Sequence, residues 1–207
     1  MKKFGLMLVV LLLPFMAQAE TFKEGVHYAK VPEVGLRSDK SKIEVIEMFG
    51  YPCPHCNNFE PLIKHWEKNK NEDVNFVRTP VAWNPSWELM ARAFYASEFM
   101  KTLDKTHEAT FHAIHVERRR FRGKEDFADY YGNLGVDTGK FQSLFNSFAV
   151  ETKIRQGRQQ LSKYGIKGVP AMVVNGKYHV TAGMAGGHKK MLEVVDFLVE
   201  KERLAAK

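Results

Sequence analysis

The sequence predicts an α/β domain whose sheet is interrupted by a block of helices. Strand signals occur at residues 43–49 and 74–78 and return at 171–180, whereas the roughly 80 residues between them carry helical periodicity. Helices placed between two halves of one sheet are typical of an insertion into an α/β domain, not of an independent tail. With 207 residues, 44% of them hydrophobic, the chain is long enough to bury a substantial core.

The first half of the sheet flanks a Cys-x-x-Cys loop. Residues Ile43–Phe49 are β-branched or mostly apolar and are followed by Gly50, which predicts a buried strand. Val74–Arg78 predicts a second strand, which completes a β-loop-α-β unit around the cysteines. Between them, four apolar residues recur with the spacing of one helical face: Phe59, Leu62, Ile63 and Trp66.

Two apolar stripes support the helical block, which we assign to residues 84–164. The first stripe consists of Trp87, Met90, Ala91 and Phe94, and the second of Phe141, Leu144, Phe145 and Phe148. We interpret both stripes as helix core. The domain built around the sheet then comprises residues 20–83 and 165–207.

The second half of the sheet reads as a hairpin followed by a helix. Ala171–Val174 and Tyr178–Val180 have strand character, and Asn175-Gly176 between them is a strong hairpin signal. A final helix is indicated by apolar residues at helical spacing: Met191, Val194, Val195 and Leu198.

Residues 1–19 have the pattern of a secretory signal peptide. Lys2 and Lys3 precede the apolar run Leu6–Met16, and Ala17-Gln18-Ala19 supplies a small-x-small cleavage site. We expect the segment to be removed, which lowers the net charge from +7 to +5 because it carries two lysines and no acidic residue. A retained N-terminal anchor is the alternative. We therefore expect a soluble, exported mature protein.

The chain has only two cysteines, Cys53 and Cys56, and they lie three positions apart. Two thiols exclude a scaffold held by several disulfides and a closed four-cysteine zinc site. A disulfide across so short a loop removes little chain entropy, so a structural role is disfavoured. Redox chemistry is the better interpretation. A metal carrier is the alternative of a different class, although no second ligand pair lies nearby.

A strand that leads through Cys-x-x-Cys into a helix places Cys53 at the helix N-terminus. Unpaired N–H groups and the positive end of the helix dipole favour a thiolate there. Pro54 suits the first helical position, and His55 adds stabilisation of the anion. A stabilised thiolate is a good leaving group, so the disulfide should act as an oxidant. Cys56, one turn into the helix, should be more buried and act as the resolving thiol.

The motif Cys53-Pro54-His55-Cys56 after a signal peptide, a helical insertion and a late Gly168-Val169-Pro170 before a strand resemble the DsbA family of periplasmic thiol:disulfide oxidoreductases. The resemblance covers nearly the whole mature chain. It implies a thioredoxin fold with an inserted all-helical domain and a cis Val169–Pro170 peptide beside the cysteines. Such a loop would present the backbone of Val169 to an extended substrate. The residues alone show that Pro170 opens a strand, and they leave the trans form open.

The same resemblance implies a function. It predicts a monomeric enzyme of the periplasm that donates its Cys53–Cys56 disulfide to reduced, unfolded exported proteins. A membrane quinone reductase of the DsbB type would then reoxidise it, with no metal or organic cofactor required. A reductase is the alternative within redox chemistry. An isomerase of the DsbC type usually carries an N-terminal dimerisation domain, for which the stretch before Ile43 is short.

Glu47 is the next candidate residue because it shares a strand face with Val45 and Phe49. Burial there would raise its pKa and allow it to relay a proton to or from Cys56. The resemblance supports this, since the family holds a buried acid at the corresponding position. The alternative is that Glu47 pairs with a cation such as Arg78.

Two further signals are set aside. His107 and His112 resemble a zincin motif, but a five-residue spacing puts them on different helix faces, and we expect solvent-facing histidines. The densest basic run is Glu117–Arg122. Export makes nucleic acid an implausible partner, so the default interpretation is a solvated surface. A weaker hypothesis is that this surface assists the encounter with anionic membranes or acidic clients.

Overall fold

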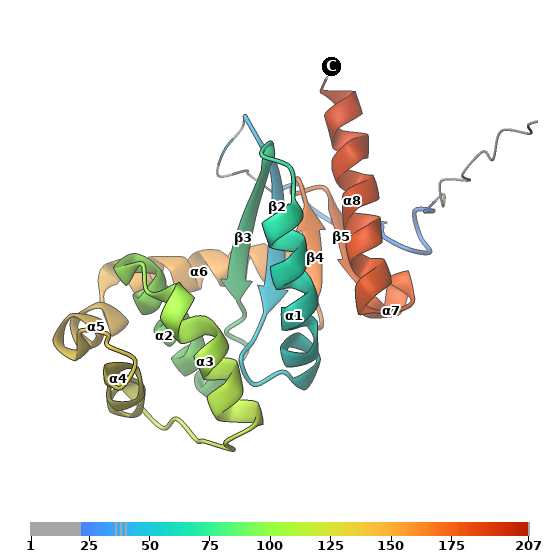
Figure 1. Cartoon of the computed structure of the whole chain (residues 1–207). Helices are drawn as coiled ribbons and strands as arrows, with labels where there is room; N and C mark the ends of the chain where they lie inside the picture. Colours follow the sequence, from blue (N-terminus) through green and yellow to red (C-terminus); the bar gives the residue numbers. More distant parts are fainter. Residues whose placement is uncertain (1–21, 36, 38, 40, 207) are drawn as a thin grey trace, which may run out of the picture.

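The computed structural model describes residues 22–35, 37, 39 and 41–206. The predicted signal peptide lies outside the described residues. The chain folds around one five-stranded sheet with helices on both of its faces and a group of helices beside it (Figure 1). Among the described residues, no helix is long and apolar enough to cross a membrane.

The sheet has the strand order β1-β5-β4-β2-β3. Its central pair, β2 and β3, is parallel, and β4 and β5 add to it as an antiparallel hairpin. The predicted strands are confirmed, although β3 extends further than expected and the short β1 was not predicted. The strands are β1 (Ala29–Lys30), β2 (Ile43–Phe49), β3 (Val74–Pro80), β4 (Ala171–Val174) and β5 (Tyr178–Thr181).

The hairpin turn has the geometry that Asn-Gly predicts. Asn175 and Gly176 both have positive φ, 54° and 63°, and the Lys177 N–H donates to the Val174 carbonyl at 3.0 Å. Gly176 is also required sterically, because a Cβ there would lie 2.8 Å from the carbonyl oxygen of Gly35.

Two helices cover one face of the sheet and a third covers the other. On the first face, α1 (Pro54–Asn69) and α8 (His188–Ala205) pack against apolar residues of the strands, and Trp66 Nε1 donates to Asp196 Oδ1 at 2.7 Å between them. On the opposite face, the last turns of α6 (Phe148–Lys163) pack on Ile46 and Met48. The short α7 (Ala182–Ala185) precedes α8 (Figure 1).

The predicted helical insert is confirmed between the two halves of the sheet. It contains α2 (Pro85–Met100), α3 (Leu103–His115), α4 (Lys124–Gly132), α5 (Thr138–Phe145) and α6. A core rich in aromatic rings holds it together: Phe121, Phe127, Tyr131, Phe141 and Phe145. The first turns of α6 pack against helices of the insert, and its last turns pack on the sheet. Because α6 belongs to both parts, the domain boundaries at 83/84 and 164/165 stay a prediction.

Two residues depart from the predicted apolar stripes. Phe148 is 79% exposed because Ser147 caps a new helix there: its Oγ accepts the Val150 N–H at 3.2 Å, so Phe148 begins α6 and does not continue α5. Leu62 is 37% exposed at the rim of a groove between α1 and α8, whereas its predicted neighbours on the stripe are buried.

Candidate active site

Cys53 lies where β2 leads into α1, at the N-cap position of that helix. Its sulfur accepts the backbone N–H of Cys56 at 3.3 Å, and its own N–H donates to the Gly50 carbonyl at 3.0 Å. Pro54 occupies the start of the helix, where the lack of an N–H costs nothing. The sequence therefore placed the first sulfur correctly at a helix N-terminus.

The two thiols have opposite electrostatic environments. Hydrogen bonds from the Cys56 side chain and from the Cys56 and His55 backbone N–H groups, with the charge of His55, lower the pKa of Cys53 to about 6. Burial, the neighbouring Cys53 and the charge of Glu47 raise the pKa of Cys56 far above that of an ordinary thiol. Cys56 has no exposed surface, whereas Cys53 is 7% exposed. At neutral pH the pair therefore consists of one slightly exposed thiolate and one fully buried thiol.

The Val169–Pro170 peptide is cis, as the family resemblance predicted. Pro170 directly precedes β4, and the loop brings the Val169 carbonyl oxygen to 3.3 Å from the Cys53 sulfur, so that it accepts the S–H of Cys53 when this thiol is protonated. The backbone of Val169 thus lies beside the reactive sulfur although the two residues are far apart in the sequence.

Glu47 is buried in the middle of β2, with 1% of its surface exposed. Arg78 Nε lies 3.2 Å from Glu47 Oε2, yet neither carboxylate oxygen accepts a hydrogen bond from the residues that the structure describes. Burial raises the pKa of Glu47 to about 8, against the opposing charge of Arg78. Both sequence interpretations therefore hold in part: the acid is desolvated and it faces Arg78.

Arg78 is shared among three carboxylates. Besides Glu47, its guanidinium contacts Glu67 at 2.8 Å and Glu60 at 3.4 Å. Three acids around a single cation leave an excess of negative charge, and the charges of Glu60 and Glu67 both add to the raised pKa of Glu47. The environment of Glu47 is thus set by α1 as well as by β3.

His107 extends this network into the helical insert. It lies on α3 and is 7% exposed, so the expectation of a solvent-facing histidine is wrong at this position. Its Nδ1 lies 2.9 Å from the Tyr51 hydroxyl, and its Nε2 lies 3.3 Å from Glu60 Oε1. His107 and the charge of Arg78 hold the pKa of Glu60 below its usual value although burial opposes this. Helical spacing alone could not reveal these partners, because they come from other elements.

His188 is a further residue that the sequence did not indicate. It begins α8, and its ring centroid lies 6.3 Å from that of His55 and 5.3 Å from that of Phe59. Burial, with the charge of His55, lowers the pKa of His188. His188 lies beside the Cys-x-x-Cys helix because α8 packs on α1. The residues next to His188 in the sequence do not indicate this contact between helices.

The residue before the cysteine loop is constrained by an aromatic ring. A Cβ on Gly50 would lie 2.3 Å from the Trp87 ring, so the ring packs directly on the backbone that leads to Cys53. Trp87 belongs to α2, so the helical insert braces the loop that carries the reactive sulfur.

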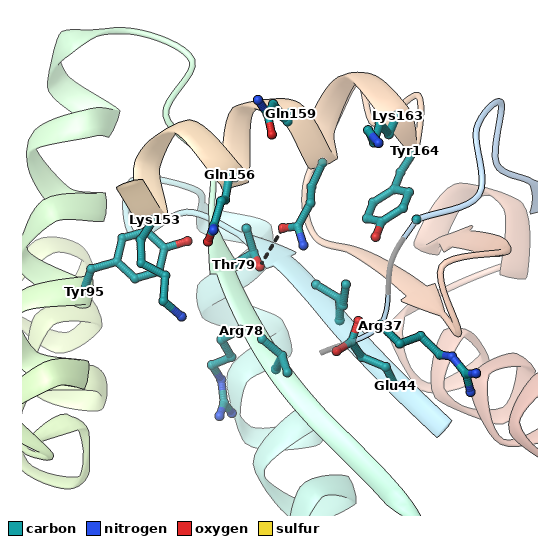
Figure 2. Close-up of a pocket in the computed structure, with 15 residues that line it drawn as sticks. Arg37, Glu44, Arg78, Thr79, Tyr95, Lys153, Gln156, Gln159, Lys163 and Tyr164 are labelled. Carbon is teal, nitrogen blue, oxygen red and sulfur yellow. Dashed lines mark hydrogen bonds between the residues drawn. The ribbon is translucent and has the colours of Figure 1, made fainter. Parts of the chain in front are cut away.

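A pocket of about 390 Å³ lies on the other face of the sheet, between α6 and strands β2 and β3 (Figure 2). Gln160, Lys153 and Tyr164 line it, and the Thr79 hydroxyl donates to Gln160 Oε1 at 3.4 Å. None of the predicted site residues lines this pocket. Within the described part of the chain, no group of three or more His, Cys, Asp or Glu residues could hold a metal ion.

The geometry defines a class of protein. A reactive cysteine at the N-terminus of the first long helix, a second buried cysteine one turn later and a cis-proline loop against the first sulfur form the site of a thiol:disulfide oxidoreductase with a thioredoxin fold. The sheet and the helical insert agree with that class.

Comparisons with known proteins give the family. Residues 63–198 match the model of the DSBA-like thioredoxin domain. The chain is 40% identical over 191 residues to the thiol:disulfide interchange protein DsbA of Pseudomonas aeruginosa, covering 92% of this chain and 90% of that protein. It is 42% identical to DsbA of Pseudomonas syringae, covering 91% and 88%. The crystal structure of Pseudomonas aeruginosa DsbA superposes with a TM-score of 0.86 at 39% identity, covering 89% of this chain and 96% of that one. The chain belongs to the DsbA family of thiol:disulfide oxidoreductases.

Proposed function

We propose that this protein works in the oxidising direction and donates a Cys53–Cys56 disulfide to reduced, unfolded exported proteins. The observation that carries the proposal is the pKa of Cys53, which is lowered to about 6. A thiolate that is stable at neutral pH stabilises the reduced enzyme and is a good leaving group, so it favours transfer of the disulfide to the client.

The exchange proceeds in two balanced steps. A client thiolate attacks the Cys53 sulfur of the disulfide, a client–Cys53 bond forms, and Cys56 leaves with the electron pair and takes up a proton. The second client thiolate then attacks the client sulfur, which releases Cys53 as a thiolate. The client loses two electrons as its disulfide forms, and the enzyme gains them as its own disulfide is reduced.

Two groups would assist these steps. Glu47, with its pKa raised to about 8, is largely protonated at neutral pH and would supply the proton that Cys56 needs. The backbone of Val169, next to Cys53, would pair with an extended client segment in the manner of strand addition. His55 and Pro54 would act on the sulfur itself, through charge and through the helix start.

The setting of the reaction follows from the family and the predicted signal peptide. We place the enzyme in the periplasm as a monomer, with residues 1–19 removed. A membrane quinone reductase of the DsbB type would accept the two electrons and restore the disulfide. The thioredoxin-like domain would comprise residues 20–83 and 165–207, and the inserted domain residues 84–164.

Equilibration with glutathione buffers of graded ratio tests the direction. The fraction of reduced protein at each ratio gives the potential of the Cys53–Cys56 pair. We expect a potential well above that of thioredoxin, about −270 mV. A value near that of thioredoxin would show a reductase and overturn the proposal.

A further inference from the structure

The basic run of the sequence forms the loop between α3 and α4, residues 116–123. Figure 1 shows this loop at the same end of the molecule as the N-terminus of α1, which carries Cys53. A hydrogen bond connects the two regions, because Nε2 of His115 donates to the Tyr51 carbonyl at 2.8 Å. The loop and the reactive sulfur therefore belong to one end of the protein.

The loop has a defined conformation. Phe121 is buried and stacks on Phe127, with ring centroids 4.0 Å apart and planes within 5°. The Arg122 N–H donates to Asp126 Oδ2 at 2.8 Å, and Arg118 has the left-handed φ of 59° that is uncommon for a residue with a side chain. This anchored backbone leaves four arginines exposed to solvent: Arg118, Arg119, Arg120 and Arg122.

These four arginines lack the acidic partners that four of the other arginines have. Within the described residues, none of their guanidinium groups lies in ion-pair distance of a carboxylate, and that of Arg119 lies 4.8 Å from the centre of the Tyr130 ring instead. By contrast, four other arginines each contact a carboxylate: Arg78, Arg92, Arg158 and Arg203. The loop holds four arginines and one acid, Glu117, which contacts His112, so it carries a concentrated positive charge of 4 − 1 = +3.

Apolar side chains are exposed beside this charge. Val116 in the loop is 63% exposed. Trp83 is 43% exposed just before α2, whose residue Ser86 lines a groove with the arginines, and its ring centroid lies 4.9 Å from that of Trp87 with the ring planes tilted by 45°. This groove of about 480 Å³ has Met90 and Ile114 on its floor. Cationic and indole side chains together are typical of surfaces that sit at the boundary between water and lipid.

We propose that residues 116–123, together with Trp83, dock the Cys53 end of the protein onto a surface of anionic phospholipids. Guanidinium groups match the geometry of phosphate, and clustered arginines are attracted to anionic lipid headgroups. A lipid surface fits better than an acidic client protein, because unfolded clients differ in charge and a fixed basic surface would exclude many of them. The inference rests on the proposed export of the chain, since it requires a membrane on the exported side.

Vesicle sedimentation tests the proposal with the protein isolated from the periplasm of expressing cells. Binding is compared between vesicles of phosphatidylcholine alone and vesicles that also contain phosphatidylglycerol. The test variant carries Arg118→Glu, Arg120→Glu and Arg122→Glu, which spares the packed Arg119. At about fivefold per arginine, three lost charges should weaken binding on the order of 100-fold or more. High salt should have a similar effect on the wild type.

A second variant controls for net charge. Lys42→Glu, Lys68→Glu and Lys70→Glu change the charge by the same amount at the opposite end of β2 and α1, and this variant should bind anionic vesicles far more tightly than the loop variant. Both variants should oxidise a neutral dithiol peptide in solution at the wild-type rate, which tests folding and the proposed function separately from lipid binding.

Three results would overturn the docking proposal. The wild type could bind vesicles without phosphatidylglycerol equally well. The loop variant could bind anionic vesicles as tightly as the wild type. The loop variant could also lose rate on acidic dithiol peptides in solution while keeping its lipid binding, which would assign the surface to acidic proteins.

Discussion

At the scale of single residues, the opposite pKa shifts of Cys53 and Cys56 arise within one helical turn, because the two cysteines lie three positions apart in the chain. The helix start supplies N–H groups to the first sulfur, and the next turn carries the second sulfur into the core. Burial disfavours a thiolate, so the hydrogen bonds to Cys53 must outweigh it for the pKa to fall. The hydrogen bond from the Cys56 side chain lowers the pKa of Cys53 most, and the backbone N–H groups and the charge of His55 add to it.

Replacing His55 by alanine should raise the pKa of Cys53 from about 6 toward, but not to, the ordinary thiol value of about 8.5. The variant loses the imidazole charge and keeps the backbone N–H of residue 55. The thiolate absorbance in the ultraviolet, followed from about pH 4 to 9, measures the change. His65→Ala, at an exposed position further along α1, is the control and should leave the midpoint unchanged. An unchanged midpoint in His55→Ala would remove the histidine from the site.

Glu47→Gln tests the proton relay. Because the pKa of Glu47 is raised to about 8, the acid can donate a proton below that pH and loses this ability as the pH rises through it. We expect disulfide exchange of the variant to be about tenfold slower, or more, below pH 8, with a weaker dependence on pH near 8. Stopped-flow kinetics with a dithiol peptide measures both.

The control for that experiment is Glu44→Gln. Glu44 is a buried acid on the same strand, at an odd spacing from Glu47 that puts it on the other face of the sheet. The Glu44→Gln variant should therefore exchange disulfides at the wild-type rate. Identical kinetics of Glu47→Gln and the wild type from about pH 5 to 8 would reject the relay and leave Glu47 as a partner of Arg78 alone.

At the scale of elements, the helical insert takes part in the redox site. Trp87 of α2 covers Gly50, and His107 of α3 bridges Tyr51 and Glu60. The insert therefore supports the segment between β2 and α1 from two helices. Trp87 contacts the backbone that leads to Cys53, and His107 contacts Glu60, one of the charged residues grouped around Glu47.

His107→Ala should destabilise the protein by about 2–3 kcal/mol, because it removes the partner of the buried Tyr51 hydroxyl and leaves Glu60 with Arg78 alone. Urea unfolding measures the change. His112→Ala is the matched control, since His112 lies on the same helix with an exposed side chain, and it should stay within about 0.5 kcal/mol of the wild type. Equal stability of the two variants would show that the His107 contacts contribute little.

The sequence predicted the helices and strands better than the contacts between them. Strands and the Asn175-Gly176 turn depend on neighbouring residues, so they could be predicted locally, and so could Cys53 at a helix start. The contacts of His107 and His188 depend on how α3 and α8 pack on α1, which periodicity does not reveal. The prediction for Phe148 is wrong for a different, local reason: α5 ends at Phe145, and Ser147 caps a new helix that Phe148 begins.

At the scale of the whole molecule, both thiols are free and the described fold is held by four apolar clusters. Stability should then depend on the redox state through two effects, the Cys53–Cys56 disulfide and the ionisation of Cys53. A disulfide across so short a loop stabilises the oxidised form by only about 2 kcal/mol in the chain-entropy treatment. The thiolate acts in the opposite sense, because it stabilises the folded reduced form.

The opposing effects of the disulfide and of the Cys53 thiolate predict that the more stable redox form changes with pH. The pKa of Cys53 is about 6 in the folded protein and about 8.5 in an unfolded chain, so its contribution is fully present above about pH 8.5 and is lost as the pH falls through 6. We expect the stability of the reduced form, relative to the oxidised form, to rise by about 1 kcal/mol per pH unit over that window after allowance for solvent screening. The oxidised form should then be the more stable at about pH 6, the two forms should be equally stable at about pH 8, and the reduced form should be the more stable above that pH.

Denaturant unfolding of both redox forms at several pH values measures this difference. Glu47 titrates in both forms, so its effect largely cancels when they are subtracted. Cys53→Ser forms no disulfide and has no thiolate at that position, so its stability should lack the rise that the reduced wild type shows. A difference between the redox forms that stays constant from about pH 6 to 8.5 would mean that Cys53 is not an acidic thiol. The oxidant direction would then lose its physical basis, because the same ionisation that stabilises the reduced fold also drives transfer of the disulfide to the client.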